Sequence, residues 1–306
     1  MTSFSDPHVI AALVAKLAAV SILISNVEYL FARRILTDGG ILSWPVASLR
    51  HAWLISGWTG RLLGCLLAYP NVLVLIGCRV ALAAFVLVAP LSLTCTPWIL
   101  LPLSFVTVAF YMRSNYGLDG ADQMAWIIVA SLTLVSVAPG RSVIVAGLWF
   151  IALQSCLSYV VAGIAKASAR GWREGTFLPA IFQTAIYGHR RLGRLLSVRP
   201  ALSSMLSRAV IAWECSFPLV LVAPPSVVAP VLLMGVAFHA VNAALMGLNT
   251  FFWSFAATYP AFCTAATTVR GNGKPGPVCR PHPPHCANWF QNPMASRSNR
   301  TVPRPG

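Results

Sequence analysis

Long apolar segments separated by short breaks recur along this chain, and they constrain its fold more than any other feature. A membrane-spanning helix needs about 20 mostly apolar residues. Segments that approach or exceed this length occupy residues 9–31, 72–89, 98–112, 124–138, 142–166, 209–222, 227–248 and 251–266. The sequence therefore predicts an all-α fold, a polytopic integral membrane helical bundle of about seven or eight spans.

The scarcity of charge supports the same fold class. Of the 306 residues, 57% are hydrophobic and only 9% are charged, whereas a soluble domain carries roughly 25% charged residues. So few charges cannot cover a water-exposed surface, so most of the surface must face lipid. These proportions exclude a soluble protein with a single anchor, and they predict a multi-pass protein of the cell membrane.

The charges that remain are strongly biased toward arginine and lysine. The formal net charge is +15, from 22 basic and 7 acidic residues. The basic residues lie mostly between apolar segments and in the tail, where they suit loops beside anionic lipid headgroups better than a nucleic-acid surface. The predicted partner is membrane lipid, and no nucleic acid is expected. The loops after the first and fifth spans hold the densest arginine groups, which predicts that both are cytoplasmic.

The last forty residues differ in character from the rest. Residues 267–306 are rich in proline and basic side chains and contain no acid, so they cannot bury enough apolar surface to fold. We predict a transmembrane domain over residues 1–266 and a disordered basic tail over 267–306. Cysteines and histidines cluster between Cys279 and Cys286, but the interspersed prolines argue against a functional zinc site, and no metal is predicted.

One further segment reads as a helix at the membrane surface. Residues 49–69 mix Trp53, Trp58, Arg50 and Arg61 with leucines. Tryptophan and arginine together favour the headgroup level, so we predict an interfacial helix here.

Polar side chains inside apolar spans are costly and usually face the bundle interior. Glu28 and Glu214 are the acids within the predicted spans, and Arg79 is a candidate counter-ion for either. Structural pairing that holds helices together is the favoured interpretation, with a functional role as the alternative.

The fifth span ends in a distinctive pattern. Ser155, Tyr159, Ala162, Gly163 and Lys166 share one helical face, because their spacing follows the helical period. Arginine supplies all but three of the basic residues, yet a lysine ends this face. A desolvated lysine can lose its proton and arginine effectively cannot. Lys166 is therefore a candidate general base, and a lysine that snorkels to the interface is an equally good interpretation of the spacing.

Two other segments carry candidate chemistry. In the seventh span, one helical face carries Gly235, His239, Asn242 and Met246. His239 can bind a ligand, shuttle a proton or pack structurally, and structural packing is the favoured interpretation. The loop at residues 115–123 places two acids beside the fourth span, either as part of a polar site or as a helix cap. The cap is favoured, and the spacing does not match a calcium loop.

Two motifs stand out in these spans. The first motif consists of Tyr159, Ala162, Gly163, Lys166, Trp172, Gly175 and Thr176. The second runs through Phe238, His239, Ala240, Val241 and Asn242 to an aromatic segment at residues 251–255. Together they resemble the horizontally transferred transmembrane domain (HTTM) family, to which the vitamin K-dependent gamma-carboxylases belong. The segments at 38–44 and 119–123 look most like the bacterial branch typified by sporulation-delaying protein B. The resemblance covers residues 9–266.

The resemblance implies a role for these residues. Lys166 matches the lysine that acts as base on the vitamin K hydroquinone, which implies a quinone-like lipid as cofactor. The first hypothesis is therefore a membrane-embedded enzyme or maturation factor that acts on such a lipid or on a secreted peptide. Its catalytic residues would be Lys166 and His239. The substrate-binding residues would be Tyr159, Asp122, Asn242 and Trp172.

Two rival hypotheses remain open at this point. A transporter or permease subunit would use Glu28, Arg79 and Glu214 in the bundle beside a proline-broken helix. A non-catalytic scaffold would bind other membrane subunits.

Overall fold

The computed structural model describes residues 6–51, 57–114 and 118–271, and every regular element in these residues is a helix. The all-α prediction is confirmed. The long helices are α1 (Pro7–Phe31), α4 (Val72–Val88), α6 (Pro97–Ser114), α7 (Gly120–Val137), α8 (Arg141–Ser168), α12 (Pro200–Ser216) and α13 (Pro225–Met246).

Shorter helices connect and extend these. They are η1 (Arg33–Leu36), α2 (Trp44–Ser48), η2 (Leu49–His51), α3 (Gly57–Leu67), α5 (Leu91–Thr94), α9 (Arg170–Glu174), α10 (Phe177–Phe182), α11 (Arg190–Val198), η3 (Phe217–Leu221), α14 (Asn249–Ala256) and α15 (Tyr259–Gly271).

Several helices are suited to a bilayer. Within the described ranges, five are long and apolar enough to cross a membrane, or six if α3 and α4, bent by 72° at their junction, count as one span. These features are consistent with an integral membrane protein. The five are α1, α7, α8, α12 with η3, and α13.

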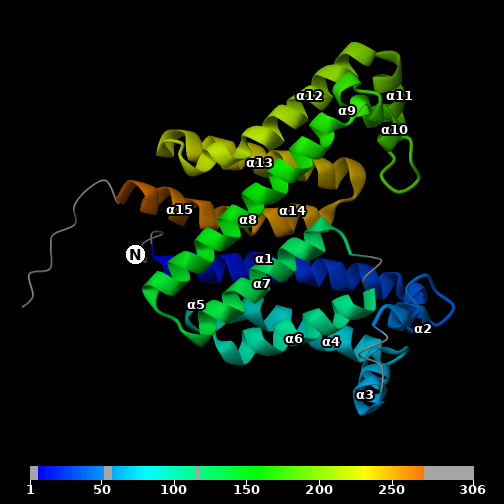
Figure 1. The fold of residues 1–306 in the computed structure, drawn as a ribbon, viewed down its shortest axis with the longest axis vertical. Helices are drawn as coiled ribbons and strands as arrows, with labels where there is room; N and C mark the ends of the chain where they lie inside the picture. Colours follow the sequence, from blue (N-terminus) through cyan, green and yellow to red (C-terminus); the bar gives the residue numbers. More distant parts are fainter. Residues whose placement is uncertain (1–5, 52–56, 115–117, 272–306) are drawn as a thin grey trace, which may run out of the picture.

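Helix α1 lies at the centre of the bundle. It contacts α4, α7, α8, α14 and α15, which surround it in Figure 1. Its sequence permits this because small side chains recur along it, and Ala11, Ala15 and Ala18, which share one face, are all buried. Small side chains let neighbouring helix backbones approach closely, so α1 can serve as a common partner for the helices around it.

The predicted eighth span is wrong in one respect. Residues 251–266 were expected to form one helix, but the chain breaks after Ala256 into α14 and α15. Pro260 at the start of α15 has no N–H to donate to the preceding turn, which explains the break. Helix α15 also continues to Gly271, beyond the domain boundary predicted at residue 266. The predicted disordered tail and its Cys279–Cys286 cluster otherwise lie outside the described residues.

The loop before α7 forms a helix cap, as predicted. Asp119 is the N-cap of α7 and accepts hydrogen bonds from the backbone amides of Ala121 and Asp122, at 2.8 and 3.0 Å.

The predicted interfacial helix corresponds in part to α3, where Trp58 is exposed. Residues 52–56, including Trp53, lie outside the described residues.

Helices α12 and α13 form the outer part of the molecule. Only 22% of the apolar stretch of each is buried, against 56% in α1. Helix α12 packs along α8, and α13 packs on α14. Figure 1 shows α9, α10 and α11 gathered where α8 turns back into α12. Helices α8, α9, α10, α12, α13 and α14 enclose a cavity.

Candidate functional site

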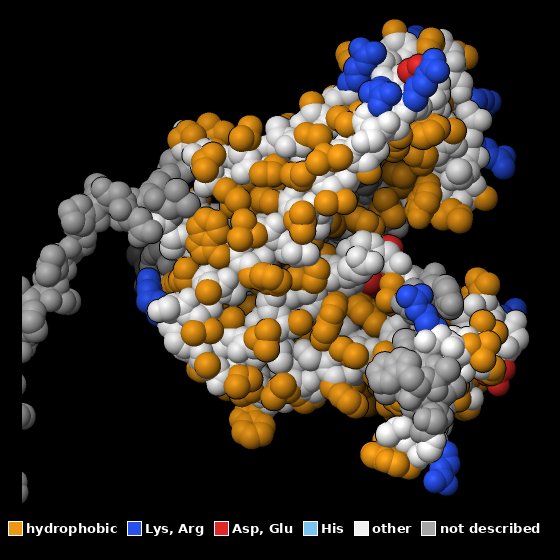
Figure 2. All heavy atoms as spheres, in the orientation of Figure 1, with side chains coloured by type: hydrophobic (Ala, Val, Ile, Leu, Met, Phe, Trp, Pro, Cys, Tyr) orange, Lys and Arg blue, Asp and Glu red, His pale blue; other side chains and the backbone are white. Residues whose placement is uncertain are grey.

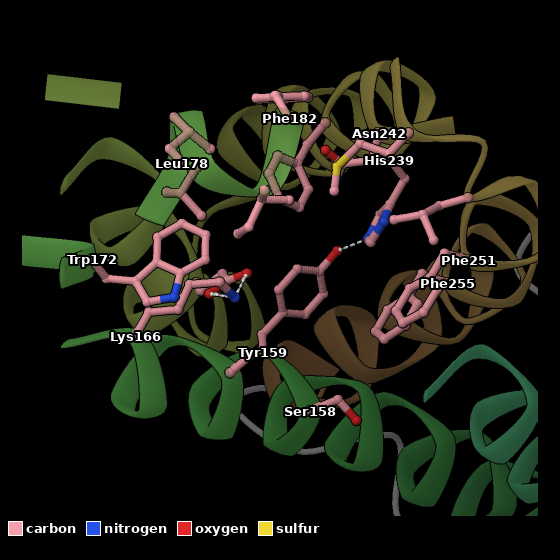
Figure 3. A pocket seen from close by; sticks show the side chains of 17 residues that line it. Ser158, Tyr159, Lys166, Trp172, Leu178, Phe182, His239, Asn242, Phe251 and Phe255 are labelled. Atoms are coloured by element: carbon pink, nitrogen blue, oxygen red, sulfur yellow. Dashed lines mark hydrogen bonds and ion pairs between the residues drawn. The ribbon is translucent and has the colours of Figure 1, made fainter. Parts of the chain in front are cut away.

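A cavity of about 360 Å³ lies among α8, α9, α10, α12, α13 and α14. Its walls are mainly aromatic and aliphatic, and a few polar groups face into it (Figure 3). The lining side chains are Ser158, Tyr159, Ala162, Lys166, Trp172, Leu178, Ile181, Phe182, Val210, Glu214, Phe238, His239, Asn242, Met246, Leu248, Phe251 and Phe255. Apolar walls with few convergent polar groups are typical of a small-molecule site.

An ion pair occupies one end of this cavity. Lys166 Nζ donates to both carboxylate oxygens of Glu214, at 2.8 and 2.7 Å. The Glu214 side chain is 7% exposed and the Lys166 side chain 22% exposed. The ammonium group also lies 5.4 Å from the ring centroid of Trp172, close enough for a cation–π interaction. Lys166 is therefore held at the cavity wall by groups from α9 and α12.

Hydrogen-bonded rings occupy the middle and far end of the cavity. The Tyr159 hydroxyl lies 2.6 Å from His239 Nε2 and 2.7 Å from the Tyr259 hydroxyl. His239 Nδ1 has no hydrogen-bond partner in the described part of the chain. The three side chains thus form a short polar chain, in which Tyr159 and His239 line the cavity and Tyr259 lies behind them. Figure 3 shows the Tyr159–His239 bond across the cavity.

Aromatic packing fixes the orientation of these rings. Phe217 stacks on Tyr159 at a centroid distance of 3.9 Å, and Phe255 stacks on His239 at 4.8 Å. Rings packed in this way lose little further freedom when a ligand binds. The polar chain is thus preorganised by residues from η3 and α14.

Glycines allow the helices of the site to approach closely. A Cβ at Gly163 would lie 2.7 Å from Cys215 Sγ and 2.9 Å from its backbone nitrogen, so α8 and α12 meet at this point. A Cβ at Gly235 would collide with the Tyr259 hydroxyl. The small-residue face predicted for the fifth span therefore brings α12, and with it Glu214, against Lys166.

The structure brings five of the six predicted site residues together. Lys166, Tyr159, Trp172, His239 and Asn242 all line the cavity, although they come from three separate helices. Asn242 has no hydrogen-bond partner among the described residues, so its amide group is available to a ligand.

The sixth predicted residue, Asp122, lies elsewhere. It is 8% exposed and is absent from the cavity wall. Ser25 Oγ donates to its carboxylate at 3.3 Å, and the Tyr111 hydroxyl donates to its backbone oxygen at 2.5 Å. The Ser254 hydroxyl donates to the neighbouring carbonyl of Ala121, so α14 passes between Asp122 and the cavity. Its predicted place in the cavity is wrong, because the cap that starts α7 directs this turn toward α1 and α6.

Asp122 belongs to a second polar group, here called the Arg79 cluster. Its members are Ser25, Asn26, Arg79, Thr107, Phe110, Tyr111 and Asp122. The guanidinium of Arg79 donates to Thr107 and Asn26 at 3.4 Å, with the rings of Phe110 and Tyr111 at 4.9 and 5.3 Å. Arg79 is completely buried, and the residues around it belong to α1, α6 and α7.

The predicted counter-ion role of Arg79 is wrong. Among the described residues it forms an ion pair with neither Glu28 nor Glu214, because Glu214 lies on α12 beside Lys166. Sequence reasoning thus missed the Lys166–Glu214 pair, although Glu214 was one of two acids in the predicted spans. It also missed Tyr259, since nothing in an isolated aromatic residue indicates that α15 will turn it toward Tyr159.

No cluster of metal-ligating side chains occurs in residues 6–51, 57–114 or 118–271. Comparison with family models, with curated proteins and with solved structures finds no match for this chain. The chemistry of the site must therefore be argued from its own geometry.

The geometry supports proton transfer beside an apolar ligand. An amine and a carboxylate in direct contact can exchange a proton, and a low-dielectric cavity reduces the energetic difference between the charged and neutral pairs. The Tyr159 hydroxyl and the Asn242 amide offer hydrogen bonds to ligand oxygens. A ring-bearing molecule with one or two oxygens matches both features.

Proposed function

We propose that this chain is a multi-pass protein of the cell membrane that acts as a membrane-embedded enzyme or maturation factor. Its substrate or cofactor is a quinone-like lipid, used directly or to modify a secreted peptide. The observation that carries the proposal is the Lys166–Glu214 pair in the wall of an apolar cavity that also presents Tyr159, His239 and Asn242. Volumes of about 300–1,000 Å³ are usual for such ligands.

The Lys166–Glu214 pair can exist in two protonation states, and the neutral state supplies the base. In the ionic state the ammonium group donates to the carboxylate. When the proton passes from Lys166 Nζ to Glu214, a neutral amine and a neutral acid result, with no change in net charge. The amine then takes the hydroxyl proton of a bound hydroquinone. Lysine is suited to this step because it can be neutral when desolvated, whereas arginine effectively cannot.

We further propose membership of the HTTM family, as the two motifs suggest. Support comes from the fact that residues from motifs far apart in the sequence, Lys166, Trp172 and His239, line one cavity. A random coincidence of weak motifs would have no reason to converge in space.

We propose eight membrane crossings. They are α1, α4, α6, α7, α8, α12 with η3, α13, and α14 with α15. Successive members of this series run in alternating directions in Figure 1, as successive crossings of one bilayer do. Helix α6 has 18 residues with a proline inside, and α14–α15 is broken between Ala256 and Tyr259. Each of them therefore needs neighbouring helices to satisfy its backbone within the bilayer.

Two experiments test the proposal. The protein is purified in mild detergent, and co-purifying lipids are identified by mass spectrometry; a quinone retained by the native protein and lost from Phe255→Trp, which fills the cavity, is the expected result. Lys166→Arg and Lys166→Ala are then compared in cells lacking the native gene. Both should insert normally and both should be inactive, because neither supplies a neutral amine.

A transporter is the alternative function. The buried Arg79 cluster favours it, because ionisable groups inside a membrane bundle often mark a substrate path. A transporter would need Arg79 for activity and would tolerate Lys166→Arg, which keeps the ion pair. A fully active Lys166→Arg protein would therefore exclude the base and leave the transporter or a scaffold for other membrane subunits.

A further inference from the structure

The connection between α8 and α12 carries an exposed concentration of positive charge. Between residues 141 and 213 the one acid is Glu174, and Arg170 Nε already binds it at 2.6 Å. The pKa of Arg170 is raised by this hydrogen bond. Lysine and arginine side chains gather at this end of the molecule in Figure 2. The remaining arginines of the segment therefore carry charge that no described acid balances.

Helix α11 organises part of this charge into one face. Gly193 and Leu196 are buried against α10. On the opposite side Arg191, Arg194 and Val198 are exposed. Arg191 forms no hydrogen bond or ion pair with any described residue. The exposed face is thus both cationic and apolar.

Such a face is poorly suited to water and well suited to a headgroup layer. Val198 is 75% exposed and Leu195 41%, and Ile186, in the turn before α11, is 80% exposed. A shallow depression on this surface is lined by Arg191, Arg194, Leu195 and Val198. Apolar side chains at this depth enter the acyl boundary while guanidinium groups bind phosphate oxygens.

The position of α11 within the fold agrees with an interfacial location. Figure 1 shows α9–α11 at the top and α3 at the bottom, and both groups lie on the right-hand side of the bundle, where α1 also ends. Helix α3 also carries an exposed Trp58 beside Arg61, a pairing typical of the headgroup level. The long helices end at this level, so α11 lies where lipid phosphates would be.

We propose that the exposed face of α11, with the turn before it, is a binding surface for the phosphate groups of anionic phospholipids. The occupant is the anionic lipid of the surrounding bilayer. This inference goes beyond the proposed function and is independent of it, because no α11 side chain lines the Lys166 cavity. Helix α10 separates the two, with Leu178 and Phe182 on the cavity side.

The test measures lipid preference of the full-length protein in detergent by native mass spectrometry. Phosphatidylglycerol and phosphatidylcholine are titrated separately. The wild type should bind phosphatidylglycerol more tightly. Each basic residue near an anionic surface strengthens binding about fivefold. The triple variant Arg190→Gln/Arg191→Gln/Arg194→Gln should therefore bind phosphatidylglycerol on the order of a hundredfold more weakly. Because all three side chains are exposed, the variant should melt like the wild type in phosphatidylcholine micelles.

Matched variants keep the result interpretable. Lysine at the same three positions should keep most of the preference, since the charge remains. The pair Arg170→Gln/Glu174→Gln removes an arginine whose charge is already balanced and should change little. If the triple variant is poorly produced, the single variant Arg191→Gln should show a smaller loss of phosphatidylglycerol binding.

Three outcomes would overturn the proposal. They are a wild type with no preference for phosphatidylglycerol, a triple glutamine variant with an undiminished preference, and displacement of the lipid by equimolar inorganic phosphate. The last would assign the site to a soluble anion instead.

Discussion

The Lys166 cavity and the Arg79 cluster both bury charge inside a helical bundle, but they do so differently. Lys166 meets its carboxylate at hydrogen-bond distance and borders open space. Arg79 is completely buried between two rings, and its hydrogen bonds to Thr107 and Asn26 are 3.4 Å long. The contrast separates a charged side chain that borders a cavity from one that is enclosed by packed side chains. Buried charge in a membrane span is therefore insufficient evidence for a site until a cavity accompanies it.

The comparison predicts that Arg79 matters most for stability. Arg79→Ala removes a fully buried side chain from between Phe110 and Tyr111. Large-to-small changes of this kind cost about 2–5 kcal/mol, because the surrounding side chains fill the space only partly. The thermal transition in detergent should fall clearly below that of the wild type. Arg79→Met, which fills much of the volume without the charge, should lose less.

The control for this prediction is Lys166→Ala. Lys166 is partly exposed to the cavity, so its removal should affect melting less than Arg79→Ala. If the two variants melted alike, the distinction between a structural and an accessible charge would be untenable.

The second prediction concerns activity rather than folding. Glu214→Gln leaves Lys166 without a proton acceptor, and general acid–base groups contribute typically 10²–10⁴-fold. Activity on the lipid that co-purifies should therefore fall by at least about a hundredfold, while insertion is unchanged. Glu214→Asp, which keeps the carboxylate on a shorter side chain, should recover part of the activity. Equal losses in both variants would point to a purely structural ion pair.

Tyr159→Phe should have an intermediate effect. It deletes the hydroxyl that joins His239 to Tyr259 but keeps the ring that stacks on Phe217. Losing a buried hydrogen-bond partner costs about 1–3 kcal/mol, so the affinity for the co-purified quinone should fall by roughly tenfold or somewhat more. Tyr259→Phe is the matched control, because it removes one hydroxyl from the same chain at a residue outside the cavity wall. Affinity in Tyr159→Phe equal to the wild type would mean that no ligand oxygen reaches this hydroxyl.

The sequence predicted the helices well because their signal is local. Apolar length and a proline or glycine at a helix end depend on neighbouring residues, and α1, α4 and α8 begin and end within about two residues of the predicted limits. The helical period also placed Tyr159 and Lys166 on a common face, since that relation is internal to α8. Which helices pack against one another is not indicated by neighbouring residues. The sequence therefore suggested Arg79 as the partner of Glu214, whereas the structure pairs Glu214 with Lys166.

Asp122 shows the limit of reasoning by motif. Its position beside a glycine-rich turn was interpreted both as a cap and as part of the active site. The local half of this interpretation is confirmed by Asp119, which caps α7. The prediction that Asp122 belongs to the active site depended on which side of α14 the turn would occupy. That is decided by long-range packing, through contacts such as Ser254 with Ala121.

The smallest effect is expected for Asp122→Asn. The amide oxygen of asparagine can still accept the Ser25 hydroxyl proton, and the backbone bond from Tyr111 is unaffected. Hydrogen bonds between side chains in membrane bundles average about 0.6 kcal/mol, so melting should shift by little and activity should stay at the wild-type level. Asp119→Ala is the control at the same turn, because it removes the cap of α7 and should cost about 1 kcal/mol. An inactive but stably folded Asp122→Asn protein would contradict this account, because it would place Asp122 in the reaction and make the Arg79 cluster a second functional site.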